Sequence, residues 1–298
     1  MSTITIGIIT HDAYLYNLEG LISRLHQQIC EKLNIEVIAL IQDSTLDKSS
    51  YNAKMYDNKG VCFLYTSKIY SPSEARNIIM GNSKGDWIAY IDGDCMIKDG
   101  YVDSVIQVIN TVYDMEDIVI IQGAIYANGV SFFGKYEAVS DIRSLFELRY
   151  KDLSDYKYTK KFEKWLRVLY QTKDMTPIHK VQGFNCIVRR TAGEFDESFE
   201  TAEDRELAMR VINQGKKIYF AQSIEVYHPY LMTLSRIVKR KEWHSRGCGR
   251  LNKKYGVKKK YSVFELFCDI LYSKSMMFAL YIVCTEFTFW KNCRRAIK

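Results

Sequence analysis

The stretch Trp87-Ile88-Ala89-Tyr90-Ile91-Asp92-Gly93-Asp94 is an apolar run that ends abruptly at two acids separated by a glycine. An aromatic and β-branched run of this length is typical of a buried strand, so its charged end is expected where a sheet meets solvent. In α/β sheets that carboxyl edge holds the ligand. Because Gly93 leaves the approach open, Asp92 and Asp94 could both reach a divalent cation or the sugar-phosphate it carries. Taken alone, the same tripeptide is also ordinary turn chemistry.

The segments before this strand predict alternating strands and helices. In chain order they are a strand from Thr3 to Ile9, a helix from Asn17 to Cys30, a strand from Ile35 to Ile41, a strand from Gly60 to Tyr65 and a helix from Ser73 to Met80. The first three form a β-α-β unit, which requires a parallel sheet with a right-handed crossover. The sequence therefore predicts an α/β domain with a ligand site at the carboxyl edge of its strands.

Composition adds limits on class and compartment. The chain has 298 residues, of which 47% are hydrophobic, so a substantial core is expected. Its eight cysteines form no C-x-x-C pair, which argues against a zinc site or a disulfide framework and suits a reducing cytosol. The first residues form a strand-like run without a basic region or a cleavage site, so we expect no signal peptide and a cytoplasmic protein.

The net charge of +7 is unevenly distributed. From Leu231 onward there are 16 basic and 4 acidic residues, a local net of +12, whereas the preceding part carries 26 basic and 31 acidic residues, a net of −5. Such a basic region could bind a membrane surface or a nucleic acid. We expect no nucleic-acid binding, because its aromatic residues show no recognisable RNA-binding pattern.

Several motifs, in their order along the chain, resemble the family 2 glycosyltransferases with the GT-A fold. They are Asp43-Ser44, Glu74-Ala75-Arg76-Asn77, Asp92-Gly93-Asp94, the run from Val181 to Arg190, the run from Gly193 to Phe199, Ala202-Glu203-Asp204 and the run from Ile224 to His228. The resemblance implies a Rossmann-like α/β fold with a mainly parallel central sheet flanked by helices. It gives a catalytic domain over residues 1–232, with a helical insertion at about 126–180, and a basic, amphipathic helical region over 233–298.

The resemblance also implies donor-binding residues. Asp43 matches the acid that binds the nucleobase, although the preceding Gln42 departs from the usual second Asp. Arg76 matches an arginine that lies against the base or a phosphate. Thr10 and Arg246 complete the predicted donor site together with the two acids of the opening stretch. The alternatives are a turn or cap role for Asp43 and a surface salt bridge for Arg76.

A metal site and a catalytic base follow from the same resemblance. Asp94 would bind Mn2+ or Mg2+ directly, Asp92 would reach the ribose and a metal-bound water, and His228 would be the third contact. Asp204 would deprotonate the acceptor in an inverting displacement, with Glu203 orienting or assisting it. A structural histidine and an acidic first turn of a helix, which is expected from Glu203 to Asn213, are the alternatives.

The insertion and the C-terminal region allow more than one interpretation. Helices at Glu137 to Lys151 and Tyr158 to Gln171 either cover the sheet or shape the acceptor cleft. His244, like Arg246, is a candidate to close over the donor phosphates, or it lies on a solvated basic helix. The processive motif Q-x-x-R-W is absent, so we expect addition of a single sugar.

The apolar segment from Phe264 to Trp290 is interrupted by charges, and its longest charge-free piece has 11 residues, short of the ~20 that span a bilayer. It is expected either to lie on the anionic cytoplasmic leaflet or to pack on the catalytic domain or a second subunit, as in a homo-oligomer. The expected partners are a nucleoside-diphosphate sugar, above all a UDP-sugar, and a saccharide, lipid-linked or peptide acceptor.

Two other functions remain open from the sequence. A sugar nucleotidyltransferase would normally carry a glycine-rich basic loop after the first strand, and Thr10 to Asn17 has none. A non-catalytic adaptor of the same fold, binding membranes or polyanions, would not need to retain Asp92, Asp94 and Asp204.

Overall fold

The computed structural model of the chain describes residues 2–11, 15–29, 32, 34–43, 60–148, 159–256 and 276–297. The Lys258-Lys259-Lys260 run and the first part of the apolar segment, 264–275, lie outside the described residues. Nine strands are described: β1 (Ile4–His11), β2 (Ile35–Gln42), β3 (Val61–Tyr65), β4 (Trp87–Asp92), β5 (Met96–Ile97), β6 (Ile118–Val130), β7 (Pro177–Ile178), β8 (Asn185–Arg189) and β9 (Lys217–Tyr230). The helices are α1 (Leu15–Ile29), α3 (Pro72–Asn82), α4 (Tyr101–Thr111), α5 (Gly134–Leu145), α6 (Thr159–Lys173), α7 (Glu203–Asn213), α8 (Leu234–Tyr255) and α10 (Met276–Ile297), with a short 3-10 turn at Arg190–Ala192.

All nine strands belong to one sheet, in the order β3-β2-β1-β4-β8-β6-β9-β5, with β7 pairing with β9. The four strands β3, β2, β1 and β4 are mutually parallel, as the β-α-β pattern predicts. Beyond β4 the sheet becomes mixed, because β8 runs antiparallel to both β4 and β6. The central sheet flanked by helices confirms the predicted α/β class, and its parallel half ends at the strand that carries Asp92.

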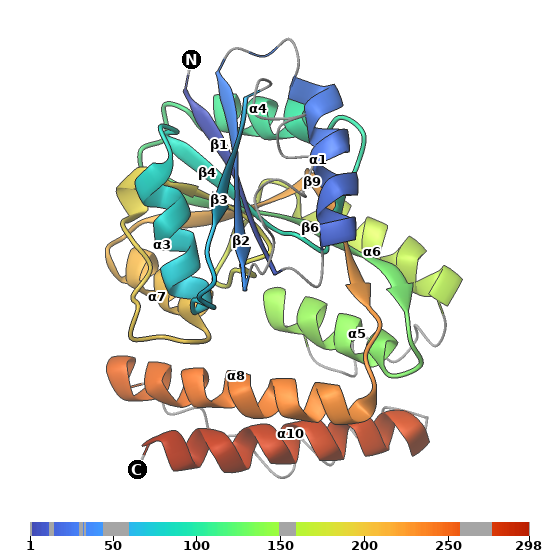
Figure 1. Cartoon of the computed structure of the whole chain (residues 1–298). Coiled ribbons are helices and arrows are strands. Elements are labelled where there is room, and N and C mark those ends of the chain that lie inside the picture. Colours follow the sequence, from blue (N-terminus) through green and yellow to red (C-terminus); the bar gives the residue numbers. More distant parts are fainter. Residues whose placement is uncertain are drawn as a thin grey trace.

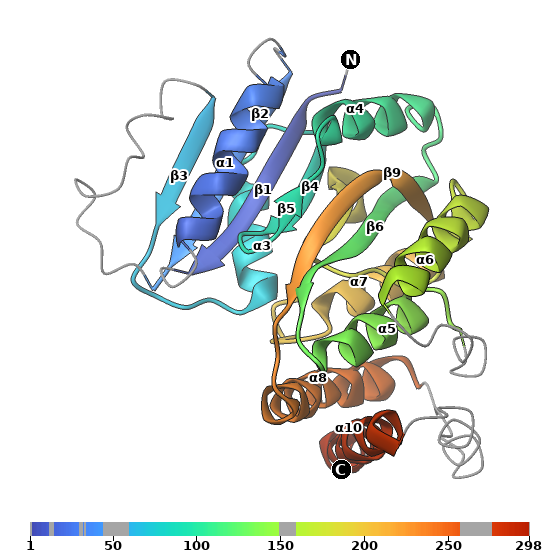
Figure 2. The ribbon, with the colours of Figure 1, turned by 90° about the vertical axis from the view of Figure 1, so that its right-hand side faces the viewer.

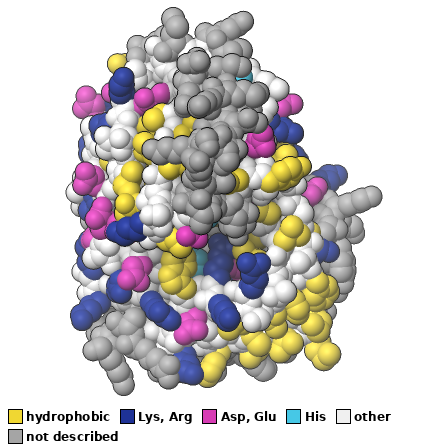
Figure 3. All heavy atoms as spheres, in the orientation of Figure 1, with side chains coloured by type: hydrophobic (Ala, Val, Ile, Leu, Met, Phe, Trp, Pro, Cys, Tyr) yellow, Lys and Arg dark blue, Asp and Glu magenta, His cyan; other side chains and the backbone are white. Residues whose placement is uncertain are grey.

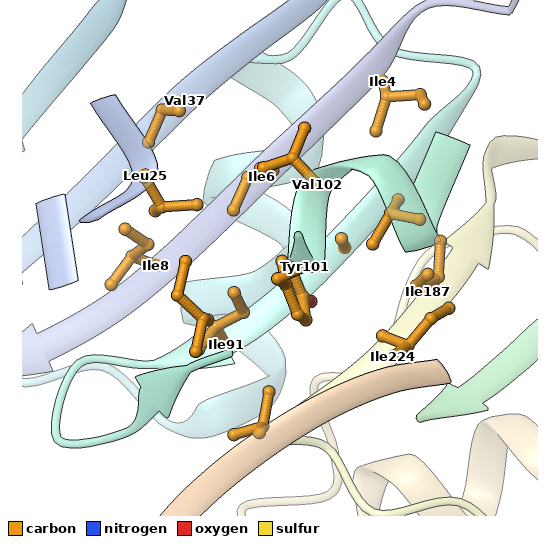
Figure 4. Close-up of a cluster of buried hydrophobic side chains, with 14 of the residues drawn as sticks. Ile4, Ile6, Ile8, Leu25, Val37, Ile91, Tyr101, Val102, Ile187 and Ile224 are labelled. Carbon is orange, nitrogen blue, oxygen red and sulfur yellow. The ribbon is translucent and has the colours of Figure 1, made fainter. Parts of the chain in front are cut away.

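Helices cover both faces of the sheet, and each face buries its own apolar cluster (Figures 1 and 2). One cluster joins β1, β2 and β4 to α1 and α4, and it includes Ile6, Leu25, Ile91 and Val102 (Figure 4). The other joins the opposite face to α3, α6 and α7. Because strands at the centre are covered on both faces, they read as continuous hydrophobic runs rather than as alternating patterns.

The start of α3 shows why the predicted helix boundary is reliable. Ser71 caps the helix, accepting a hydrogen bond from the Glu74 backbone N–H, and the Glu74 carboxylate accepts one from the Ser71 backbone N–H, 2.9 Å away. Pro72 occupies the first turn, where its missing N–H has no cost. This reciprocal cap fixes the helix that carries Arg76.

The C-terminal helices α8 and α10 lie side by side beneath the sheet and its flanking helices (Figure 1). Buried polar contacts attach them to α5. Lys241 on α8 lies 3.1 Å from the Glu137 carboxylate, and the Tyr281 hydroxyl on α10 donates to the same carboxylate at 2.6 Å. Arg143 pairs with Glu286 at 3.0 Å. One face of α10 therefore packs on the chain's own domain, which is one of the arrangements the sequence allows for this segment.

Candidate functional site

A cavity of about 610 Å³ opens at the carboxyl edge of the parallel strands. Residues from β1, β2, β4, α3 and α7 form its upper wall, and residues from α5, α8 and α10 form its floor. Parallel pairing places Ile9 beside Asp92 and His11 beside Gln42, so these strand ends meet at one edge. Topology thus brings polar residues from distant parts of the sequence to one place.

Asp92, the last residue of β4, lines this cavity together with Gly93 and Asp94, which follow the strand. Gly93 is required by its neighbours, because a Cβ there would lie 2.4 Å from the Cβ of Thr10, and its N–H donates to the Ile9 carbonyl at 2.8 Å. The glycine therefore serves close packing against β1, a reason that the sequence analysis did not identify. Burial raises the pKa of the Asp92 carboxyl to about 6, while the nearby Arg76 opposes that rise. Burial also raises the pKa of Asp94.

Arg76 and Glu203 form a buried ion pair that links α3 to the start of α7. Their side chains are 5% and 7% exposed. Gly183 makes room for the guanidinium, since a Cβ at that position would lie 2.2 Å from Arg76 Nη2. Burial alone would lower the pKa of Arg76, but the Glu203 carboxylate raises it. The pKa is raised overall, so the guanidinium stays charged. The alternative of an ordinary surface salt bridge for Arg76 is wrong, because the pair is buried in the cavity wall.

Asp204 and Glu203 are adjacent in the first turn of α7 but have different partners. Its two carboxylate oxygens accept hydrogen bonds from the Gly183 N–H at 3.1 Å and from the Arg205 N–H at 2.7 Å. The side chain is only partly buried and lines the cavity. These two N–H groups hold the carboxylate in place while leaving room for a further proton donor.

His228, on β9, lines the cavity between two aromatic rings, those of Phe184 and Tyr230, with centroids 4.6 and 4.9 Å away. Burial, with a smaller contribution from Arg240, lowers its pKa to about 3, so the ring is neutral. Its Nδ1 atom is buried and has no hydrogen-bond partner in the described structure. A neutral imidazole with an unsatisfied nitrogen is suited to a ligand or a metal.

Two predicted donor-binding residues are not among those that line the cavity. Asp43 is exposed just beyond β2 with a positive φ of 54°, and the preceding Gln42 lines the cavity instead, accepting from the Tyr70 N–H at 2.6 Å. The Arg246 side chain is 61% exposed and pairs with Glu242 at 3.5 Å. His244, by contrast, lines the cavity.

The sequence analysis missed a cluster of charged residues on the cavity floor. Arg240 on α8 lies 4.0 Å from the Asp141 carboxylate of α5 and donates from Nε to His244 at 3.2 Å. The Tyr230 hydroxyl donates to the same Asp141 at 3.2 Å. Arg240 also lies near enough to Asp92 for each to affect the pKa of the other. In the sequence, nothing distinguishes this arginine from its basic neighbours.

The residues present fit a divalent metal that is shared with a substrate. No group of three or more His, Cys, Asp or Glu side chains within the described ranges is arranged to hold a metal by itself. Mg2+ and similar cations commonly take one or two carboxylates and complete their shell with waters and substrate phosphates. Asp92, Asp94 and His228, which has an unsatisfied ring nitrogen, all line one cavity and provide such a partial ligand set.

Comparison with known proteins agrees with this geometry. The sequence profile for "Glycosyl transferase family 2" matches residues 5–192. A search of curated proteins found no significant match. The mannosyltransferase PcManGT from Pyrobaculum calidifontis, solved in complex with GDP-Man and Mn2+, is similar to this chain with a TM-score of 0.57 at 8% identity, over 100% of this chain and 81% of its own.

Two further solved structures are similar at 13% identity. S. aureus TarS 1-349 has a TM-score of 0.51 over 99% of this chain and 90% of its own, and GalNAc-T7 with UDP, GalNAc and Mn2+ has a TM-score of 0.51 over 95% and 56%. At such low identities these likenesses establish the fold alone. The GT-A fold predicted from the sequence is confirmed.

Proposed function

Because this chain belongs to glycosyl transferase family 2 and is therefore a glycosyltransferase, we propose that it is a metal-dependent, inverting enzyme that transfers one sugar from a nucleoside-diphosphate sugar. The observation that carries the proposal is a single cavity that holds the acids after β4, the buried Arg76 and the carboxylate of Asp204. Family membership favours this function over a sugar nucleotidyltransferase or a non-catalytic adaptor. The proposed acceptor is a saccharide, a lipid-linked glycan or a peptide.

The proposed donor is a UDP-sugar, bound along the strand ends with its diphosphate beside Asp92 and Asp94. The complexes of PcManGT with GDP-Man and of GalNAc-T7 with UDP support a nucleotide-sugar donor of this general kind. Thr10 and Gln42 lie at the same edge, where a nucleoside would fit, and Asp43 would join them only by turning inward. Arg76 and Arg240 both supply positive charge near Asp92.

Asp204 is the proposed catalytic base. Its carboxylate would accept the proton of the acceptor hydroxyl as that oxygen forms a bond to the anomeric carbon and the bond from this carbon to the diphosphate breaks. A single displacement of this kind inverts the anomeric configuration. Glu203 is already paired with Arg76, so its proposed role is to hold the guanidinium and the start of α7 in place.

Asp94, Asp92 and His228 are the proposed metal contacts. A bound Mn2+ or Mg2+ would supply positive charge that stabilises the departing diphosphate. In both PcManGT and GalNAc-T7 the solved complexes contain Mn2+, which supports a divalent ion here. The neutral state of His228 is the one that can donate an electron pair to such an ion.

The test is a screen of donor hydrolysis and thermal stabilisation over UDP-, GDP- and dTDP-sugars, with and without Mn2+. We expect one nucleotide class to raise the melting temperature and to be hydrolysed only with the metal. Asp94→Asn should abolish both effects, whereas Asp99→Asn, a 96%-exposed carboxylate beyond β5, should leave them unchanged. The proposal fails if no nucleotide sugar is bound or turned over and Asp94→Asn behaves as the parent protein.

A further inference from the structure

The exposed face of α8 carries a row of positive charge. Of its six exposed basic residues, Lys254 pairs with Asp196 and Glu206, and the other five recur at helical spacing: Arg236, Lys239, Arg246, Arg250 and Lys253. This spacing keeps them on one side of the helix. The single acidic residue of α8, Glu242, lies beside them and pairs with Arg246. We call this row the basic stripe.

The neighbouring helix α10 carries an exposed row of apolar side chains. Met276, Leu280 and Val283 are 85%, 44% and 42% exposed and lie four and three residues apart, so they share one face. The opposite face, with Tyr281 and Ile282, is fully buried against the domain. We call the exposed row the apolar stripe. None of the described helices combines the length and the hydropathy that crossing a bilayer requires.

Both kinds of side chain are visible from the same side of the molecule. Figure 3 shows Lys and Arg side chains across the lower part of this face, over α8, and hydrophobic side chains gathered at the lower right, where α10 begins beneath α5. A surface that joins apolar and basic side chains suits a partner that is itself apolar inside and negatively charged outside.

We propose that the basic and apolar stripes together form a docking surface for an anionic lipid bilayer. Lys and Arg attract anionic headgroups, and exposed Met, Leu and Val side chains enter the boundary between headgroups and acyl chains. The charge distribution orients the molecule, because the part from Leu231 onward carries +12 and the rest −5. A polyanion would use the basic stripe alone. A second copy of this chain would use the apolar stripe, but its docking would bring the basic stripes of the two copies closer together, which is unfavourable.

The docking surface also has a position that matters for the cavity. Trp243 and His244 on α8, and Thr285 and Phe289 on α10, line the cavity from below. The two helices therefore separate the cavity from the surface that would rest on lipid, so an acceptor held in the bilayer would lie close to the cavity floor. Membrane binding does not depend on the proposed sugar transfer, so an experiment can refute either proposal and leave the other intact.

The test is flotation of the full chain with vesicles of phosphatidylcholine alone or with about one-third phosphatidylglycerol. We expect binding to the anionic vesicles only, and weaker binding at ~1 M salt, where the screening length falls to ~3 Å. The variant Arg236→Gln/Lys239→Gln/Lys253→Gln should bind roughly 100-fold more weakly, at about fivefold per charge. Its matched control is Lys84→Gln/Lys164→Gln, which removes exposed lysines elsewhere.

The apolar stripe has its own variant and control. Met276→Gln/Leu280→Gln/Val283→Gln should reduce binding at least tenfold, whereas Met115→Gln/Val168→Gln, which alters exposed residues away from α10, should not. Circular dichroism checks that each variant is folded. The proposal is overturned if the parent chain ignores anionic vesicles, if it binds a soluble polyphosphate but no vesicle, or if the apolar variant changes only the oligomeric state.

Discussion

Removing Arg76 should destabilise the protein by an amount that depends on pH in a defined way. In Arg76→Met the carboxylate of Glu203, 7% exposed, would lose its charged partner. An unpaired buried carboxylate takes up a proton instead of staying charged. Protonating a carboxyl with an ordinary pKa of ~4.3 costs about 3.7 kcal/mol at pH 7, at ~1.36 kcal/mol per pH unit. That figure lies within the ~3–5 kcal/mol measured when one partner of a buried pair is removed.

The sign of the pH dependence follows from linkage. Burial raises the pKa of Glu203 even in the parent protein, where the Arg76 guanidinium opposes the rise. In the variant this opposition is lost, so the folded-state pKa lies further above its unfolded value and stability falls as pH rises above ~4.3. Urea unfolding followed by circular dichroism should therefore show a loss of at most about 3–4 kcal/mol at pH 7 that shrinks to at most about 1 kcal/mol at pH 5. The double variant Arg76→Met/Glu203→Gln should recover most of the loss.

The matched control is Arg167→Met, which removes a 51%-exposed arginine 3.8 Å from Glu225. That carboxylate keeps Lys98 at 2.7 Å, so the cost should stay below ~1 kcal/mol and should not depend on pH. A cost for Arg76→Met that is equally small, or that is the same at pH 5 and pH 7, would contradict the reasoning.

Three further predictions can be checked with the same methods. Asp204→Asn should lower kcat by about 10²–10⁴-fold with little change in unfolding, which steady-state transfer assays would measure. Gly93→Ala should cost about 1–3 kcal/mol of stability in urea unfolding, because the new Cβ would lie 2.4 Å from a threonine of β1. Gly81→Ala in α3 should instead stabilise the protein by about 0.5–1 kcal/mol, because no atom lies within 4 Å of its new Cβ. Lys254 lies 2.7 Å from both Asp196 and the buried Glu206, and its hydrogen bond lowers the pKa of Asp196 to about 2. Lys254→Met should therefore cost at least about 1 kcal/mol above pH ~4, after allowance for solvent screening, and the part due to Asp196 should fade as pH falls toward 2 in acid unfolding curves.

The local pattern of the sequence was enough to predict most of the elements around the site. The limits of α7 agree with the predicted helix from Glu203 to Asn213, and the predicted strand Trp87 to Ile91 is β4 without its last residue. Both rest on short-range signals, namely an acidic first turn and a buried apolar run. The antiparallel insertion of β8 between β4 and β6 has no such local signal, because strand order depends on long-range packing.

The site residues show the same difference between positions that a local pattern predicts and positions that depend on long-range packing. The acids that follow β4 could be placed from the sequence because they end a recognisable strand. The pairing of Arg76 with Glu203 could not, because it joins residues 127 positions apart. Arg240 was missed for a related reason. It sits in a basic run, and only the fold shows that Arg240 and Lys241 face inward, to Asp141 and Glu137, while Lys239 faces outward.

The inward cations of α8 bear on where the catalytic unit ends. A boundary near residue 232 is a prediction from the family resemblance, yet α8 and α10 form the cavity floor and supply partners to the buried Glu137. Deleting α10 would remove the Tyr281 hydrogen bond to that carboxylate and the Glu286 partner of Arg143. We therefore expect truncation to lower stability and transfer together. Substitutions confined to the exposed stripes are consequently the ones that can separate membrane binding from catalysis.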